Sequence, residues 1–226
     1  MLSGNTDCYQ PAERKFGITR KMLEVLVKYK HPVGLITKNS LILRDIDLLQ
    51  ELAQHDLVSV AVSINSLNED LRQKMEPRTA SCLKRLNIIE QLAVKKIPVS
   101  VMVAPVIPGL NDHEIARVIQ AAAERGAYTA GYTIVRLNGE IAGIFEDWIR
   151  KTFPDKAEKV LHRIQACHGG HLHDSRWGTR MHGEGNIADA IRQLFDLACK
   201  KFFPPRQHFS FNLRAFRRPS GQMELF

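Results

Sequence analysis

Four short apolar runs that alternate with helical stretches constrain the fold of this chain most strongly. The runs lie at 33–37, 57–64, 99–104 and 130–136, and each has the length of a strand. The run at 57–64 is apolar on both faces, which is typical of a sheet that is covered on both sides. Residues 1–7 have the pattern of one more strand end that leads into a polar turn. This order predicts an α/β fold with five parallel strands.

The stretches between and after these runs predict helices. We expect Thr19 to cap the first helix, and Asn111 with Glu114 has the spacing of a capping box for a helix that ends near Gly126. Further helices are predicted around 46–52, 68–75, 80–96, 141–152, 155–166 and 187–202. From Pro204 onward we expect little fixed structure apart from possible local contacts.

The pattern divides the chain into three parts. The sheet-bearing part is predicted at 1–138, and a helical extension with a loop rich in histidine and glycine follows at 139–203. The remainder, 204–226, is predicted to be a flexible basic tail.

Composition indicates the cellular compartment in which the protein functions. No apolar run is long enough to span a bilayer, and the first residues lack the basic and then apolar layout of a secretory signal. The four cysteines are scattered, which argues against a disulfide framework and favours a reducing compartment. They are Cys8, Cys82, Cys167 and Cys199. We therefore expect a cytoplasmic protein without a membrane partner.

Positive charge is concentrated near the end of the chain. The net charge is +8, and the segment from Lys200 onward contributes +5 of it, because six lysine and arginine side chains there face only Glu224. Such an excess on a mobile tail attracts polyanions, and nucleic acid is the partner that it suggests. The alternative is a solvated basic tail that has no partner.

Polar side chains follow the predicted strands at the point where each strand ends. Because the carboxyl ends of parallel strands meet at one edge of a sheet, we expect these side chains to share one mouth. Lys38 comes directly after a buried strand and could meet a carboxylate or a phosphate there, or it could be an exposed loop lysine. The other candidates for the mouth or for contact with substrate are Asn5, Thr6, Asp7, Tyr9 and Arg136, and the polar strand-end residues also include Thr37, Ser63, Asn65 and Ser66.

Six short motifs follow one another along nearly the whole chain. They are GNTDCYQPAE at 4–13, ITKNS at 36–40, VSI at 62–64, EPR at 76–78, APVIPGLND at 104–112 and DSRWGTRM at 174–181. In this order they resemble a radical S-adenosylmethionine (radical SAM) family that is related to spore photoproduct lyase. The ordered series is far more specific than any one of its motifs.

The resemblance implies a partial (β/α)6 barrel of the TIM type, from which this chain lacks the first strand. In that family a [4Fe–4S] cluster binds the amine and carboxylate of S-adenosylmethionine, and reductive cleavage gives a 5′-deoxyadenosyl radical that abstracts hydrogen from substrate. By position in the pattern, Lys38 and Ser63 would bind the carboxylate and the ribose of the cofactor. Arg78 is a further candidate for the carboxylate, and residues 105–108 would pack near the adenine. The lyase-like branch suggests repair or modification of nucleic acid.

The sequence departs from this family at the cluster itself. The chain has no Cys-x3-Cys-x2-Cys spacing, which normally supplies the three thiolates, and Cys8 alone cannot hold a cluster. We therefore assign no catalytic residue, expect no [4Fe–4S] cluster on this chain, and expect it to be inactive alone. A truncated gene or gene model explains the missing strand and cysteines together. A pseudoenzyme, or a separate chain that supplies both, remains as an alternative.

Two further segments suggest other functions. The loop at 167–174, with the sequence CHGGHLHD, has enough side chains to ligate zinc, but it lacks a paired second cluster, so we interpret it as structural and predict no metal site. The residues Gln222, Leu225 and Phe226 resemble the Gln-x-x-Leu-Phe peptide with which bacterial replication and repair proteins dock on the sliding clamp. This resemblance implies a non-catalytic DNA-repair adaptor as the alternative to an enzyme.

Overall fold

A parallel sheet of four strands forms the centre of the protein, as the apolar runs predict. The computed structural model describes residues 1–226 except 3, 5, 175, 204–208 and 219–226. The strands are β1 (Val33–Thr37), β2 (Val58–Ser63), β3 (Val99–Val106) and β4 (Ala130–Ile134), and they lie in this order across the sheet. Each neighbouring pair is parallel, with Val33 opposite Val58 and Val60 opposite Val99. The α/β fold class is therefore confirmed.

The opening residues add a single bridge to this sheet. Leu2 pairs in parallel with Leu35 of β1, and its amide donates to the Gly34 carbonyl at 2.8 Å. The fifth strand that we predicted is therefore reduced, within the described residues, to this one bridge beside β1.

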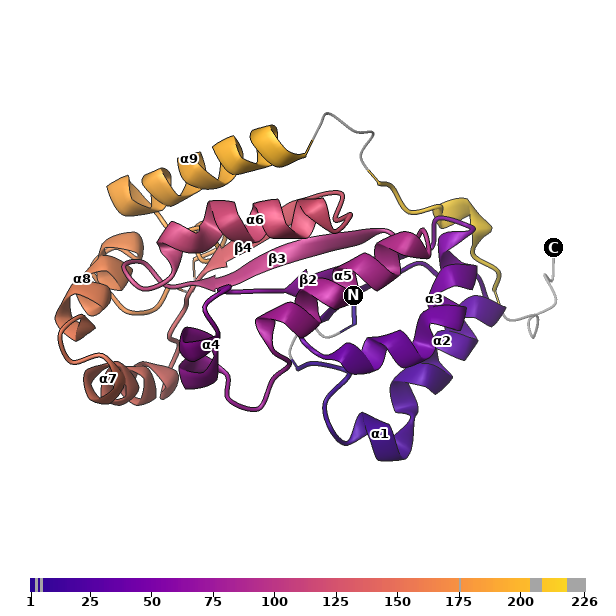
Figure 1. Cartoon of the computed structure of the whole chain (residues 1–226), viewed down its shortest axis with the longest axis horizontal. Coiled ribbons are helices and arrows are strands. Elements are labelled where there is room, and N and C mark those ends of the chain that lie inside the picture. Colours follow the sequence, from indigo (N-terminus) through magenta and orange to yellow (C-terminus); the bar gives the residue numbers. More distant parts are fainter. Residues whose placement is uncertain (3, 5, 175, 204–208, 219–226) are drawn as a thin grey trace, which may run out of the picture.

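Helices cover one face of the sheet, and Figure 1 shows α5 and α6 lying along the strands. Val58, Val60 and Val62 of β2, which contacts α3 and α5, are fully buried, whereas Ser59 and Ala61 on the opposite face are only half-buried. In the described part of the chain the second face is therefore covered less completely than we predicted. The helices of this layer are α2 (Ile18–Lys28), α3 (Ile46–Ala53), α5 (Cys82–Val94) and α6 (Ile115–Glu124), with short α1 (Glu13–Phe16) and α4 (Glu69–Met75) at the loops.

Two predicted helix caps have other roles. Gly17, with φ of 61°, precedes α2, and Thr19 lies inside the helix, where its hydroxyl donates to the Cys8 carbonyl at 2.8 Å. Asn111 and Glu114 form no capping box, because their side chains reach other loops. Asn68 and Ser81, in contrast, cap α4 and α5 through their side chains.

Three α-helices follow β4 in the described part of the chain. They are α7 (Ile141–Thr152), α8 (Ala157–Cys167) and α9 (Gly185–Phe202), close to the ranges that we predicted. α9 lies along α6 on the outside of the sheet layer (Figure 1), while α7 and α8 share a small apolar core with Leu71, Ile107 and Leu110. The helical extension thus packs directly on the sheet-bearing part. The boundaries at 138 and 203 stay predictions.

The segment 209–218 crosses the end of the sheet where the strands begin. The Asn212 amide donates to the Asp56 carbonyl at 3.0 Å, and the Arg217 amide donates to the Tyr29 carbonyl at 2.9 Å. The Phe209 ring lies 6.3 Å from the Tyr128 ring, measured between centroids. Our expectation of little fixed structure after Pro204 is therefore wrong for this stretch, because these backbone bonds and rings hold it against the turns. Among the described residues, no helix is both long and apolar enough to cross a membrane.

Candidate functional site

A largely apolar pocket opens where the strands end, and its volume is about 530 Å³. The end of α4 forms one wall, the exits of β3 and β4 form the floor, and α7 forms the opposite wall. The indole of Trp148 on α7 donates to the Lys74 carbonyl at 3.2 Å, which ties the two walls together. The lining residues that matter below are Glu76, Pro77, Pro105, Ile107, Val135 and Arg136. A concave apolar site with a few polar groups is typical of small-molecule binding.

Lys38 reaches the rim of this pocket through an ion pair with Glu76. The Lys38 ammonium group follows β1, and Glu76 follows α4, so the pair joins two loops at the mouth. The side chain of Lys38 is 33% exposed and that of Glu76 is 12% exposed. An ammonium group has three donors, and Glu76 occupies one of them. Lys38 therefore keeps donors for an anionic ligand.

Arg85 holds Glu76 from the buried side. Its Nη2 donates to Glu76 Oε2 at 2.6 Å and to the Thr79 hydroxyl at 2.5 Å, while Nη1 donates to the Ser63 carbonyl at 3.0 Å. The side chain of Arg85 is only 1% exposed, so these bonds form away from water. A buried guanidinium charge is tolerated when it donates to several well-aligned acceptors, as Arg85 does here.

The pKa of Glu76 reflects both of its partners. Burial by itself raises the pKa of this carboxyl, but the charges of Lys38 and Arg85 and their hydrogen bonds outweigh burial and lower it below the ordinary value. Glu76 is therefore a carboxylate at neutral pH, and it is available to orient Lys38.

Asp7 fastens the opening loop to the end of β1. Its carboxylate accepts from the Thr37 hydroxyl at 2.9 Å, from the Lys38 amide at 2.8 Å and from the Tyr9 amide at 2.9 Å. The backbone of Lys38 is thus held on one side by Asp7 while its side chain is held by Glu76. The role of Asp7 seen here is to position the mouth.

The loop after β2 is tied to the loop after β3 by two long-range side chains. Asn111 donates to the Asn65 carbonyl at 2.7 Å and accepts from the Ile107 amide at 2.6 Å. Glu114 accepts from the Ser66 hydroxyl at 2.7 Å and from the Leu67 amide at 2.8 Å. These bonds fix two of the strand exits that meet at the mouth.

Asn65 has buried polar atoms that these bonds do not satisfy. The residue is 1% exposed, and neither its side-chain oxygen nor its nitrogen has a partner in the described part of the chain. A buried amide without partners costs free energy unless a ligand satisfies it. Asn65 is therefore a candidate ligand residue, two positions beyond Ser63.

The structure places the predicted site residues at different depths. Arg136 lines the pocket, as expected of a mouth residue, and Ser63 is buried at the end of β2. Arg78 is exposed one residue beyond Pro77, and Thr6 is exposed in the opening loop. Tyr9 is fully buried in the main core, where burial raises the pKa of its phenol. Asn5 lies outside the described residues, as do Gln222, Leu225 and Phe226, so docking on a sliding clamp stays a prediction.

The loop rich in histidine and glycine is held mainly by hydrogen bonds. His168 is bonded through Nε2 to the Val135 carbonyl at 2.8 Å, and the Asp174 carboxylate accepts from Arg176 and from the Thr179 hydroxyl. The bonds from Arg176 lower the pKa of Asp174 well below its usual range. In the part of the chain that the structure describes, no three side chains of histidine, cysteine, aspartate or glutamate come together as a metal site.

The cysteines do not fit the iron–sulfur cluster that the resemblance implies. Cys8 lies in the opening loop, Cys82 at the start of α5, Cys167 at the end of α8 and Cys199 on α9. Burial raises the pKa of each of the last three thiols to about 11. Cluster ligands are thiolates that converge on one point, so these four side chains do not form such a site.

Sequence reasoning missed the parts that Glu76, Arg85 and Asn111 play in the site, and it placed Asn65 at the mouth only as one of several polar strand-end residues. Glu76 stands in the EPR motif at 76–78, which was a signal, although its role as the partner of Lys38 was not visible. The burial of Arg85, inside the predicted helix 80–96, is visible only in the structure, where it indicates a bonded partner because arginine is rarely buried without one. Nothing in the sequence marks Asn65 as unsatisfied.

Comparisons with known proteins agree with the motif series. Residues 1–122 match the family model described as the radical SAM superfamily. An uncharacterized protein of Mycobacterium tuberculosis is 32% identical over 158 residues, which cover 68% of this chain and 46% of that protein. An uncharacterized protein of Methanocaldococcus jannaschii is 26% identical over 162 residues, which cover 72% of this chain and 59% of that protein. The chain spans about half the length of these curated relatives.

Proposed function

This chain belongs to the radical SAM superfamily, and on that premise we propose that the pocket at the mouth of its sheet binds S-adenosylmethionine. The observation that carries the proposal is the ion pair of Lys38 with Glu76 at the rim of a pocket of about 530 Å³. The pocket joins one charged rim to an apolar floor, and the cofactor likewise joins a charged amino-acid end to an adenine ring.

The residues present fit the two ends of the cofactor. Lys38 has donors left for the carboxylate, and the unsatisfied amide of Asn65 can both donate and accept. Pro105 and Ile107 supply the apolar surface on which the adenine would rest. When bound to a reduced cluster, the cofactor supplies the radical that abstracts hydrogen from substrate. The part of Lys38, Glu76 and Arg85 is to bind and orient the carboxylate end.

We further propose that the 226 residues alone do not carry out the radical reaction. The support is the spread of the four cysteines over four elements, with three thiols whose pKa is raised by burial. Anaerobic reconstitution with iron and sulfide should leave the chain without a stoichiometric cluster. Incorporation of about four irons per chain would overturn this part of the proposal.

The branch and the substrate class are proposals as well. The ordered motifs from 4–13 to 174–181 support the spore photoproduct lyase-like branch, and the basic segment from Lys200 onward supports nucleic acid as the substrate. Repair or modification of nucleic acid by a lyase-like reaction is therefore the activity that we propose for the complete enzyme. The scattered cysteines, none of which is in a disulfide, support work in the cytoplasm.

Titration calorimetry with S-adenosylmethionine tests the binding proposal. K38M removes the positive charge and leaves Glu76 facing the ligand carboxylate, so affinity should fall at least about tenfold, given the worth of a hydrogen bond to a charged group. K84M is the matched control, because Lys84 is exposed on α5 and lies away from the pocket. Equal affinity in K38M and K84M would refute the assignment of Lys38.

A further inference from the structure

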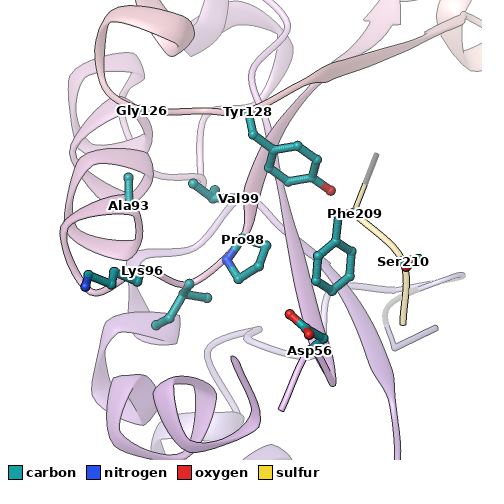
Figure 2. A pocket seen from close by; sticks show the side chains of 10 residues that line it. Asp56, Ala93, Lys96, Pro98, Val99, Gly126, Tyr128, Phe209 and Ser210 are labelled. Carbon is teal, nitrogen blue, oxygen red and sulfur yellow. The ribbon is translucent and has the colours of Figure 1, made fainter. Parts of the chain in front are cut away.

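The face opposite the mouth carries a second pocket. The turns that precede the four strands and the segment 209–218 form this face, which we call the amino-end face. The pocket there has a volume of about 460 Å³, within the range of about 300–1,000 Å³ that is usual for ligand sites. Figure 2 shows the Tyr128 and Phe209 rings along one wall, Lys96 on the opposite side and Asp56 below. The α4, α7 and strand-exit residues of the mouth are absent from its lining.

Basic side chains without ion pairs are frequent on the amino-end face, and one of them lines the pocket. Two lysines lie at or just after the end of α2, two directly follow α5, and three arginines lie in the segment 209–218. They are Lys28, Lys30, Lys95, Lys96, Arg214, Arg217 and Arg218, and none of them forms an ion pair with another described residue. All but Lys30 are exposed. Lysines at helix ends complement the helix dipole, but the arginines of 209–218 do not, since that segment contains only a three-residue turn of helix.

Aromatic side chains are interleaved with these charges. The Phe209 and Phe211 rings meet edge to face at 5.1 Å between centroids, and Phe216 meets the His31 ring at 5.2 Å. Phe211 and Phe216 are 37% and 43% exposed. The Tyr128 hydroxyl is bonded to the Ser59 hydroxyl at 3.1 Å, so that wall of the pocket is fixed in place.

We propose that the amino-end face binds single-stranded nucleic acid. The phosphates contact the seven basic side chains named above, which we call the basic rim, and one unpaired base lies in the pocket. Basic residues that follow a backbone, with aromatic faces for the bases, are the usual means of binding single strands. Asp56 supplies an acceptor for the amino group of a base. Nucleic acid that is bound here lies at the opposite end of the sheet from the mouth. This site therefore tethers the nucleic acid and does not present the reacting base.

Two other occupants fit the face less well. Duplex nucleic acid satisfies the charges but leaves the pocket empty, because its bases are paired. An anionic lipid surface is usually bound by an amphipathic helix that presents an apolar face, whereas here Tyr128 and Phe209 line a pocket. The following experiment distinguishes both from the proposal.

Fluorescence anisotropy with the full 226-residue chain and a labelled single-stranded DNA of mixed sequence tests the site. K95E/K96E reverses two charges at the rim, and affinity should fall at least about tenfold at moderate salt because phosphate contacts are lost. K156E/K159E makes the same change of net charge on α8 and should stay within about twofold of the unmodified chain. R214E/R217E is a second, independent rim variant and should behave like K95E/K96E.

F209A separates contact with a base from simple charge attraction. It should weaken binding of the single strand several-fold while binding of inorganic polyphosphate is unchanged. Circular dichroism checks that each variant is folded. The proposal is overturned if rim and control variants lose affinity equally, if a duplex of the same length binds as tightly as the single strand, or if the rim variants lose only binding to phosphatidylserine vesicles.

Discussion

Arg85 donates to Glu76 at 2.6 Å, and this buried bond is what fixes the carboxylate that holds Lys38 at the mouth. The arrangement places one fully buried charge behind one mostly buried charge, and the partly exposed Lys38 comes last. Each of the three side chains depends on the one behind it for its position.

R85M should be strongly destabilising. The change leaves the buried Glu76 carboxylate without its inner partner and the Ser63 carbonyl without a donor, so the free energy of unfolding should fall by about 3–5 kcal/mol. Urea denaturation measures this loss. K84M, on the exposed side of the same helix, should change stability by less than about 0.5 kcal/mol. Similar losses in both variants would show that the buried hydrogen bonds of Arg85 contribute no more to stability than an exposed residue of the same helix.

The contribution of Glu76 to stability should depend on pH. Its folded pKa is below the ordinary value of 4.5, so the charged form is stabilised in the native state. The stability that it contributes is present above pH 4.5 and is lost as pH falls through the lowered folded pKa. E76Q should therefore be less stable than the unmodified chain near neutral pH, and the difference should shrink in acid. A difference that is constant with pH would show that Glu76 acts through shape and not through charge.

N111A should loosen the mouth as well as the fold. Asn111 joins the Asn65 carbonyl to the loop at Ile107, and its loss leaves buried backbone groups unpaired. The free energy of unfolding should fall by about 1–3 kcal/mol. N138A, at an exposed position after β4, is the control and should have little effect. Because Asn111 borders the pocket floor, affinity for S-adenosylmethionine should fall in N111A even at temperatures where the variant is fully folded.

Hydrogen exchange should reveal the backbone bonds of 209–218. The amides of Asn212 and Arg217 donate to Asp56 and Tyr29, whereas no backbone acceptor is found for the amides of Ser210 and Arg218 among the described residues. The first pair should exchange more slowly than the second pair when measured residue by residue by NMR. Equal exchange at all four positions would contradict the docking of this segment.

Two thiols should resist alkylation in the native chain. Cys82 and Cys167 are buried, and their burial raises each pKa to about 11, so little thiolate is present or accessible. Iodoacetamide at mildly alkaline pH should label both only after unfolding in urea, as read by mass spectrometry. Rapid labelling of Cys82 before unfolding would show that the start of α5 opens readily.

Much of the fold follows from local pattern. The strand at 33–37 and the helix at 141–152 have the ends that periodicity predicts, because each is bounded by clear polar or helix-breaking residues. Lys38 was predicted at the mouth because it directly follows a buried strand, and in the structure its ammonium group pairs with Glu76, which lines the pocket there. Local pattern does not predict hydrogen bonds that a side chain forms with a loop far away in the sequence. Asn111 and Glu114 have the spacing of a capping box, yet they bond to residues 65–67, which no local rule could reveal.

Contacts between distant segments also explain the other differences. Tyr9 was expected at the mouth because it stands in a polar loop, but the loop turns back and buries its ring in the core. Little fixed structure apart from local contacts was expected from Pro204 onward. Phe209 and Phe216 instead contact Tyr128 and His31, which precede β4 and β1. These contacts between distant segments form only when the sheet has brought the segments together, so local sequence does not predict them.

The position of the segment 209–218 bears on how the protein is made. Its hydrogen bonds to Tyr29 and Asp56 join segments that are far apart in the sequence. During synthesis the four strands emerge before residues 209–218 do, so the aromatic and apolar surface of the amino-end face stays open until that segment has left the ribosome. Ribosome-bound chains that end at residue 203 should therefore be a form that chaperones recognise, whereas released chains that include residues 209–218 should not.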